Sequence, residues 1–146
     1  MTDLREQFEA VLAELGELMR VPLALDGSDS CALRIGSEID VRLTYVREGE
    51  RLAVRSPAGE LPPDAAASGL ARRLLALCGD ADASRGLVLA MDGGTRRLEV
   101  RGECPATWLH SADRLAEWLE RLILFRSRIR DEIEGGSERE LVIIRI

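Results

Sequence analysis

The segment from Leu23 to Ser56 constrains the fold most, because apolar and polar residues alternate along it in three short runs. The runs cover residues 31–35, 39–45 and 51–55. Alternation with a period of two places one set of side chains on a core and the other toward solvent. Gly36-Ser37 and Glu48-Gly49 separate the runs, and glycine in these positions favours tight hairpin turns. The segment is therefore predicted to form a three-stranded antiparallel meander.

Three amphipathic segments flank or follow this meander. Residues 3–20 carry apolar side chains at helical spacing, and Pro22 is expected to end that helix. A loop over 57–63 precedes a second helix from about Asp64 to Cys78, which Gly79 is expected to stop. A longer third helix is predicted from Thr107 or Ser111 to Glu134, with Gly135-Gly136 as its end.

A second hairpin is predicted from residues 87–91 and 98–100, joined by the turn Asp92-Gly93-Gly94-Thr95. Residues 87–91 are apolar on both faces of a strand, so both sides of this strand should be buried. In a chain this small, a partner subunit is the expected cover for one of them.

These elements give the order α-βββ-α-ββ-α, an α+β fold in which helices pack on a twisted, mainly antiparallel sheet. We assign residues 1–134 to one domain, since 146 residues suffice for a single core. Residues 135–146 are interpreted as a glycine hinge and an apolar tail. The segment 141–146 has strong β preference, and we expect it to dock on a sheet edge or in a groove.

Composition excludes several functional classes. The formal net charge is −6, and all 20 basic residues are arginine, without a cluster large enough to bind phosphates. Nucleic-acid binding is therefore not expected. No apolar run approaches the length of a membrane span, and residues 1–20 lack the pattern of a signal peptide. A cytoplasmic location without membrane insertion is the expectation.

Candidate catalytic groups are few. His110, Ser111 and Asp113 are close in sequence, but the members of a triad converge from separate elements, so we interpret them as a helix N-terminus with a surface histidine. The loop beginning at Asp26 has Ser37 where a calcium loop needs glutamate. The cysteines are too few and too far apart for a disulfide framework or a metal clamp: Cys31, Cys78 and Cys104. No catalysis, metal or cofactor is expected.

Three sequence segments carry a pattern that is specific in its order. The first includes Leu12-Ala13-Glu14-Leu15-Gly16 and continues through residues 21–27 to Cys31-Ala32-Leu33-Arg34-Ile35. The other two are residues 86–92 and residues 97–105. Together they resemble the type III secretion effector chaperones, small acidic dimeric proteins typified by the Tir chaperone. The individual motifs are loose apolar patterns, but their joint order over residues 3–134 is more specific. The shorter polar segment 78–86 and the apolar tail depart from the family pattern.

The resemblance implies an α+β homodimer that acts without ATP in the bacterial cytoplasm. It implies binding of the N-terminal region of one or a few secreted effectors, which is kept extended for secretion. The effector-binding positions that it implies are Leu4, Phe8, Leu12, Leu33, Ile35, Leu43, Leu52 and Val54. The dimer-interface positions that it implies are Leu70, Leu74, Leu77, Val88 and Ala90.

Two other functions remain open from the sequence. One is a regulatory protein of the same fold that sequesters a protein partner to control secretion genes. The other is a small hydrolase or ligand-binding domain that uses His110 or Asp26. A chaperone should co-purify with an effector's N-terminal segment, a regulator with a folded cytosolic factor, and an enzyme should lose activity on His110→Ala.

Overall fold

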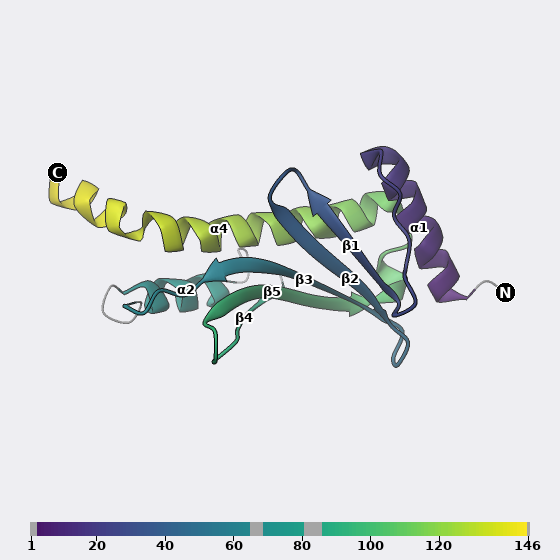
Figure 1. Ribbon diagram of the computed structural model, residues 1–146, viewed down its shortest axis with the longest axis horizontal. Coiled ribbons are helices and arrows are strands. Elements are labelled where there is room, and N and C mark those ends of the chain that lie inside the picture. The colour runs from purple at the N-terminus through teal and green to yellow at the C-terminus, as the bar shows by residue number, and fades with distance from the viewer. Residues whose placement is uncertain (1–2, 65–68, 81–85, 146) are drawn as a thin grey trace.

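A computed structural model shows an α+β fold in which helices cover one face of a five-stranded antiparallel sheet (Figure 1). The structure describes residues 3–64, 69–80 and 86–145, and for 135–145 the backbone alone. In chain order the elements are α1 (Leu4–Met19), β1 (Ser30–Ile35), β2 (Ile39–Val46), β3 (Arg51–Glu60), α2 (Leu70–Gly79), β4 (Val88–Met91), β5 (Arg97–Pro105), the 3₁₀ helix η1 (Ala106–Trp108) and α4 (Ala112–Arg145). The predicted fold class is confirmed.

The strands are ordered β1-β2-β3-β5-β4, and every neighbouring pair is antiparallel. The meander and the second hairpin join through β3 and β5, with Val54 opposite Gly102. Because α2 intervenes between β3 and β4, the chain returns to the far side of β5. This topology leaves β1 and β4 as the two edges of the sheet.

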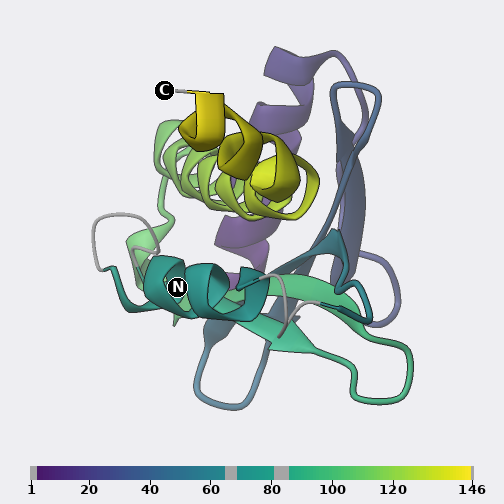
Figure 2. The same ribbon diagram turned by 90° about the vertical axis from the view of Figure 1, so that its left-hand side faces the viewer.

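The core lies between the sheet and the helices α1 and α4. Figure 2 views α4 nearly end-on and shows the sheet bending around one side of it. The largest side chains that are fully buried here come from α1, β2, β3 and α4: Phe125, Leu12, Leu43, Leu52, Leu115, Leu122 and Ile129. The second face of the sheet carries no helix. On β1, β2 and β3 it is lined mainly by polar side chains, as the alternation in the meander predicts, and on β4 it carries Val88, which lies opposite Arg101.

Helix α1 begins and ends as its sequence predicts. The Asp3 carboxylate accepts a hydrogen bond from the Arg5 backbone N–H, which caps the first turn. After Met19, Arg20 adopts a left-handed conformation, and Val21 donates to the Gly16 carbonyl at 2.9 Å. A Cβ on Gly16 would lie 2.5 Å from the Val21 carbonyl oxygen, so only glycine allows the chain to fold back this closely.

Two boundaries in the middle of the chain differ from the prediction. The predicted loop over 57–63 is strand up to Glu60, because a bulge between Pro57 and Gly59 lets β3 continue past a proline. Helix α2 begins at Leu70 rather than near Asp64, because Gly69 is left-handed (φ +77°) and cannot belong to an α-helix. Asp64 itself lies in a turn, and residues 65–68 lie outside the described residues.

Helix α4 contradicts the predicted stop at Gly135-Gly136, since its backbone is helical through both glycines to Arg145. Glycine in a helix costs about 1 kcal/mol relative to alanine, which weakens a helix without breaking it. The backbone of 137–145 is helical, so the expected pairing of the tail with a sheet edge is wrong there, whereas its docking in a groove stays a prediction. The division into a domain over 1–134 and a tail stays a prediction.

Candidate protein-binding site

Several large apolar side chains remain exposed in the single chain, although the core is well filled. Among the described residues they are Leu18, Val21, Leu75, Val88, Met91, Trp108 and Leu124. Large apolar side chains that gather at one place on a surface commonly mark contact sites for other proteins. Two such places can be built from the elements described above, one beside β4 and one around η1.

The first place is the α2–β4 edge, which we define by Leu75, Val88 and Met91. Leu75 on α2 is 73% exposed and Val88 on the edge strand β4 is 56% exposed. The end of α2 lies close to β4, since the backbone N–H of Leu89 donates a hydrogen bond to the Cys78 sulfur. The α2–β4 edge therefore presents apolar side chains next to a strand whose outer edge pairs with no strand that the structure describes, a combination that favours pairing with another chain.

The second place is the η1 groove, formed by two hollows that share Thr107, Leu109 and His110. One hollow, of about 440 Å³, lies between η1 and α1 and is lined by Leu4 and Phe8. The other, of about 600 Å³, lies between β5, η1 and α4 and contains both tryptophans, Trp108 and Trp118.

Trp108 is 65% exposed and Trp118 is half-buried. Gly102 forms part of the same hollow, where a Cβ would lie 2.5 Å from the Leu87 side chain. Tryptophan contributes large apolar area together with an indole N–H, and it is enriched among the residues that dominate binding energy at interfaces. The η1 groove thus has the composition of a protein contact site.

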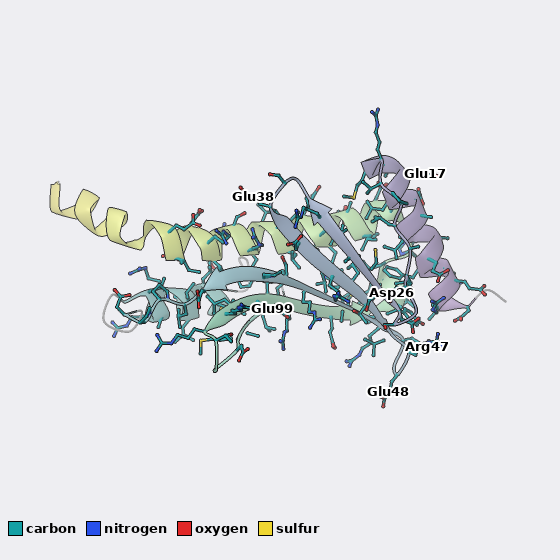
Figure 3. The ribbon with its side chains drawn as sticks, viewed as in Figure 1. Glu17, Asp26, Glu38, Arg47, Glu48 and Glu99 are labelled. Carbon is teal, nitrogen blue, oxygen red and sulfur yellow. The ribbon has the colours of Figure 1, made fainter. Side chains whose placement is uncertain are left out.

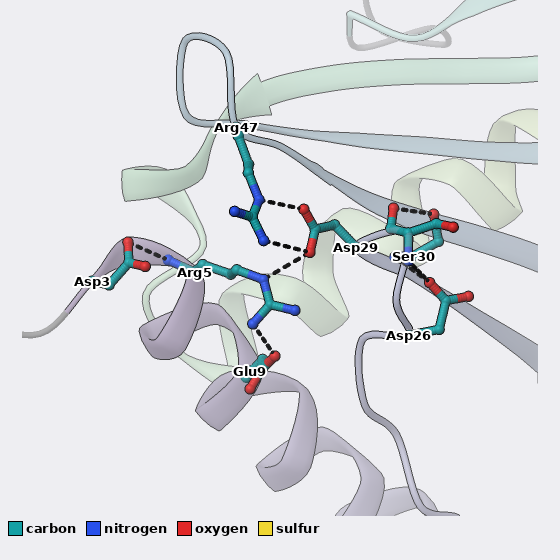
Figure 4. A network of polar contacts seen from close by, with 8 residues as sticks. Asp3, Arg5, Glu9, Asp26, Asp29, Ser30 and Arg47 are labelled. Carbon is teal, nitrogen blue, oxygen red and sulfur yellow. Dashed lines mark hydrogen bonds and ion pairs between the residues drawn. The ribbon is translucent and has the colours of Figure 1, made fainter.

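A polar network holds the start of α1 against the meander and so fixes one wall of the η1 groove (Figure 4). Asp29 lies just before β1 and accepts from Arg5 Nε of α1 at 2.8 Å and from Arg47 Nε after β2 at 2.7 Å. Arg5 also pairs with Glu9 one turn later in the helix. Hydrogen bonds from Arg47 and Arg5 lower the pKa of Asp29 to about 2.

This network predicts a specific pH dependence of stability. Because the folded pKa of Asp29 lies below its ordinary value of 3.8, its stabilising contribution is complete above about pH 4 and is lost as the pH falls toward 2. Asp29→Asn should therefore unfold more easily than wild type at about pH 6, and the two proteins should converge at about pH 2. Urea unfolding across this range measures the difference, and a constant gap would contradict the network's role.

The candidate catalytic residues His110 and Ser111 lie between η1 and α4. His110 is exposed at the groove, and Ser111 is occupied by accepting the Arg114 backbone N–H at 3.2 Å. Burial raises the pKa of the Cys104 thiol to about 11 and also raises that of Cys31, so both are protonated near neutral pH. The described part of the chain holds no cluster of potential metal ligands and no helix that could span a membrane.

The comparison with protein families decides which family this architecture represents. Residues 10–129 match the model of the Tir chaperone protein (CesT) family. The chain belongs to the Tir chaperone family. No curated protein sequence matches this one.

Solved structures of type III secretion chaperones share the fold. A chain of the HopA1–SchA chaperone–effector complex is 19% identical, with a TM-score of 0.71 over 90% of this chain and 99% of that one. A chain of the ExsC–ExsE complex is also 19% identical, with a TM-score of 0.74 over 90% and 97%. A chain of the ExoU–SpcU complex of the Pseudomonas aeruginosa type III secretion system is 20% identical, with a TM-score of 0.65 over 87% of this chain and 98% of that one. The resemblance inferred from the sequence is confirmed.

This Tir chaperone family member buries most of the side chains predicted to bind an effector. Phe8, Leu12, Leu33, Leu43, Leu52 and Val54 belong to the core, whereas Leu4 and Ile35 are half-buried. The η1 groove brings Leu4 and Phe8 together with η1, and the sheet residues lie elsewhere. Effector contact by these eight positions stays a prediction. A side chain that is buried in the single chain can contact a partner only where it lines a hollow.

The predicted dimer-interface residues are also divided between core and surface. Leu70 and Leu74 are buried, Leu77 and Ala90 are half-buried, and Val88 is exposed. The buried side of α2 packs on α4, where Arg73 pairs with Glu132 at 2.9 Å. A dimer role for these five positions stays a prediction, with Val88 the most accessible of them.

Sequence reasoning missed Trp108 and Leu75, the most exposed residues of the two places. Trp108 falls where the third helix was expected to begin, and no periodic pattern surrounds it. Leu75 follows Leu74 in a run of apolar residues, so the sequence does not show which of these side chains faces the core and which faces solvent. An isolated tryptophan between a strand and a helix was the available indication for Trp108.

Proposed function

We propose that this chain is a type III secretion chaperone that binds the N-terminal segment of a secreted effector and keeps it extended. The observation that carries the proposal is the η1 groove on a member of this family: two adjoining hollows of mixed polar and apolar lining, one of which contains the exposed Trp108. One of the structures that share the fold of this chain, the HopA1–SchA complex, is a chaperone–effector complex. The proposed location is the bacterial cytoplasm.

Apolar burial supplies the binding free energy in this proposal. Each Å² of apolar surface removed from water contributes roughly 25 cal/mol before the ordering of the client segment is subtracted. Trp108 and Trp118 would take apolar anchors of the client, and the free edge of β1 could accept a client strand. Such binding is reversible without a chemical step, so no ATP is needed.

The active species in this proposal is a homodimer formed through the α2–β4 edge. The described part of the chain leaves more than half of the residue surface exposed at three positions of this edge: Leu75, Val88 and Met91. A second copy would bury them symmetrically and pair or cover the free edge of β4. Val88 and Met91 lie on opposite faces of β4, because they stand opposite Arg101 and Leu98. The second copy would therefore have to cover both faces of this edge strand as well as the exposed side of α2.

The test is co-expression with the N-terminal segment of the secreted protein encoded by the adjacent gene. Wild type should co-purify with this segment in the absence of nucleotide. Trp108→Ala should weaken binding roughly 30-fold, because truncating a central tryptophan of an interface typically costs 2 kcal/mol or more. Isothermal titration calorimetry measures the change in Kd.

Leu124→Ala is the matched control, since Leu124 is as exposed as Trp108 but does not line the η1 groove. It should bind like wild type. Equal binding by Trp108→Ala would remove the η1 groove from the proposal. Capture of a folded cytosolic factor in place of the secreted segment would indicate the regulatory alternative.

A further inference from the structure

Three arginines stand side by side on the face of the sheet that carries no helix. Arg42 of β2 lies directly opposite Arg55 of β3, and Arg55 lies directly opposite Arg101 of β5. All three side chains are exposed. Side chains at directly opposite positions have Cβ atoms about 5 Å apart, so this arginine row concentrates like charge across three adjacent strands.

The neighbouring carboxylates do not neutralise the whole arginine row. Glu99 pairs with Arg101 at 2.7 Å, and Asp40 with Arg34 at 2.8 Å. Glu103 pairs with Arg51 at 3.2 Å. Glu38 and Glu48 lie in the turns at the two ends of β2 (Figure 3).

Arg42 and Arg55 make no ion pair or hydrogen bond through their side chains with any residue that the structure describes. Two unpaired positive charges therefore remain at the centre of this face.

The arginine row borders a hollow of about 530 Å³ on the same face. Arg42 and Arg55 line this hollow together with Arg34, Asp40, Pro57 and Glu99. Its two carboxylates are the ones already paired with arginine, so the guanidinium groups of Arg42 and Arg55 are the available charges. Ala32 and Pro57 add small apolar surface where an extended segment could lie.

We propose that Arg42 and Arg55 bind an acidic segment of the protein client on this face of the sheet. The inference rests on the proposed function and adds the chemistry of a second contact, distinct from the η1 groove. Guanidinium groups bind carboxylates through two parallel hydrogen bonds, which select both charge and direction. In a chain of net charge −6, this patch attracts an acidic segment that most of the surface repels, and so it orients the client.

A nucleic acid fits this face less well than a peptide carboxylate. Binding to a phosphate backbone depends on many cations that release counterions together. Within the hollow, Arg42 and Arg55 are the two arginines without a partner among the described residues, and they lie on an acidic chain. One or two carboxylates on an extended segment match this number of charges.

The arginine row also predicts opposite effects on stability and binding. Like charges directly opposite each other destabilise a sheet, so replacing Arg42 and Arg55 should leave the protein equally or more resistant to urea. A residue pair that served only the fold would not behave in this way.

The experiment measures fluorescence anisotropy of a labelled synthetic peptide in which glutamate alternates with alanine. A twin peptide with glutamine in place of glutamate tests charge, and a short single-stranded DNA of similar length tests phosphate binding. Wild type should bind the glutamate peptide, more weakly at about 300 mM than at about 50 mM NaCl, and should not bind the other two. Arg42→Gln with Arg55→Gln should weaken glutamate-peptide binding about fivefold or more.

The matched control is Arg20→Gln with Arg128→Gln, which removes two exposed arginines, one directly after α1 and one on α4, and leaves the arginine row intact. It should bind the glutamate peptide like wild type. Equal binding by the Arg42/Arg55 variant, or tighter binding of the DNA, overturns the inference. If wild type binds the glutamate peptide but does not bind the secreted segment, the result overturns the proposed function alone.

Discussion

Phe125→Ala is expected to lower the free energy of unfolding by about 3–5 kcal/mol. Phe125 is fully buried on α4, where the helix packs into the core beside the sheet. Alanine would remove most of that side chain, and the surrounding structure could close the cavity only in part. Since whole domains are stable by about 5–15 kcal/mol, this single change should bring the protein close to unfolding. Urea unfolding followed by circular dichroism measures it.

The neighbouring residue provides a control for this prediction. Leu124 is 65% exposed, so Leu124→Ala on the same helix should change stability by less than about 0.5 kcal/mol. A comparable decrease in the free energy of unfolding for both variants would mean that Phe125 does not anchor α4 in the core. A loss confined to Phe125→Ala would establish which face of α4 belongs to the core.

Leu75→Asp is expected to raise the dissociation constant of the proposed homodimer about 100-fold. Leu75 is 73% exposed in the single chain and is the α2 residue of the α2–β4 edge. Burying an unpaired carboxylate in an apolar interface costs several kcal/mol, which exceeds the roughly 2.7 kcal/mol that corresponds to a factor of 100. Analytical ultracentrifugation over a range of concentrations measures the shift from dimer to monomer.

Leu18→Asp introduces the same charge at an equally exposed leucine of α1, outside the α2–β4 edge. Its dimer dissociation constant should stay close to that of wild type. A wild-type protein that is monomeric at high concentration, or a dimer that Leu75→Asp leaves intact, would place the subunit contact elsewhere. Either result would still leave the η1 groove available for a client.

Much of the fold was predictable because its elements repeat with regular periods. The alternation from Cys31 to Val54 identifies the meander, and the helical spacing from Leu4 to Met19 identifies α1. The turn between Met91 and Arg97 likewise identifies the second hairpin. In each case the local pattern and the tertiary packing favour the same structure, so the pattern is sufficient.

The boundaries that were not predicted depend on backbone geometry at glycine and proline. Gly69 takes a left-handed conformation that delays α2, whereas Gly135 and Gly136 are helical and let α4 continue. Glycine permits both conformations, so its presence alone does not choose between a helix stop and a helix interior. Pro57 similarly falls at a bulge within β3, where packing of β3 on β5 extends the strand beyond it.

Residue order alone determined the types of element, their order, the antiparallel hairpins and the side chains that share a face, because these follow from periods of about 3.6 and 2 residues. Tertiary structure alone decided which apolar faces are covered. Phe8 and Leu52 are in the core, whereas Trp108 and Leu75 are at the surface. The reason is that burial depends on what packs against a face from a distant part of the chain, as α4 does, and no local period carries that information.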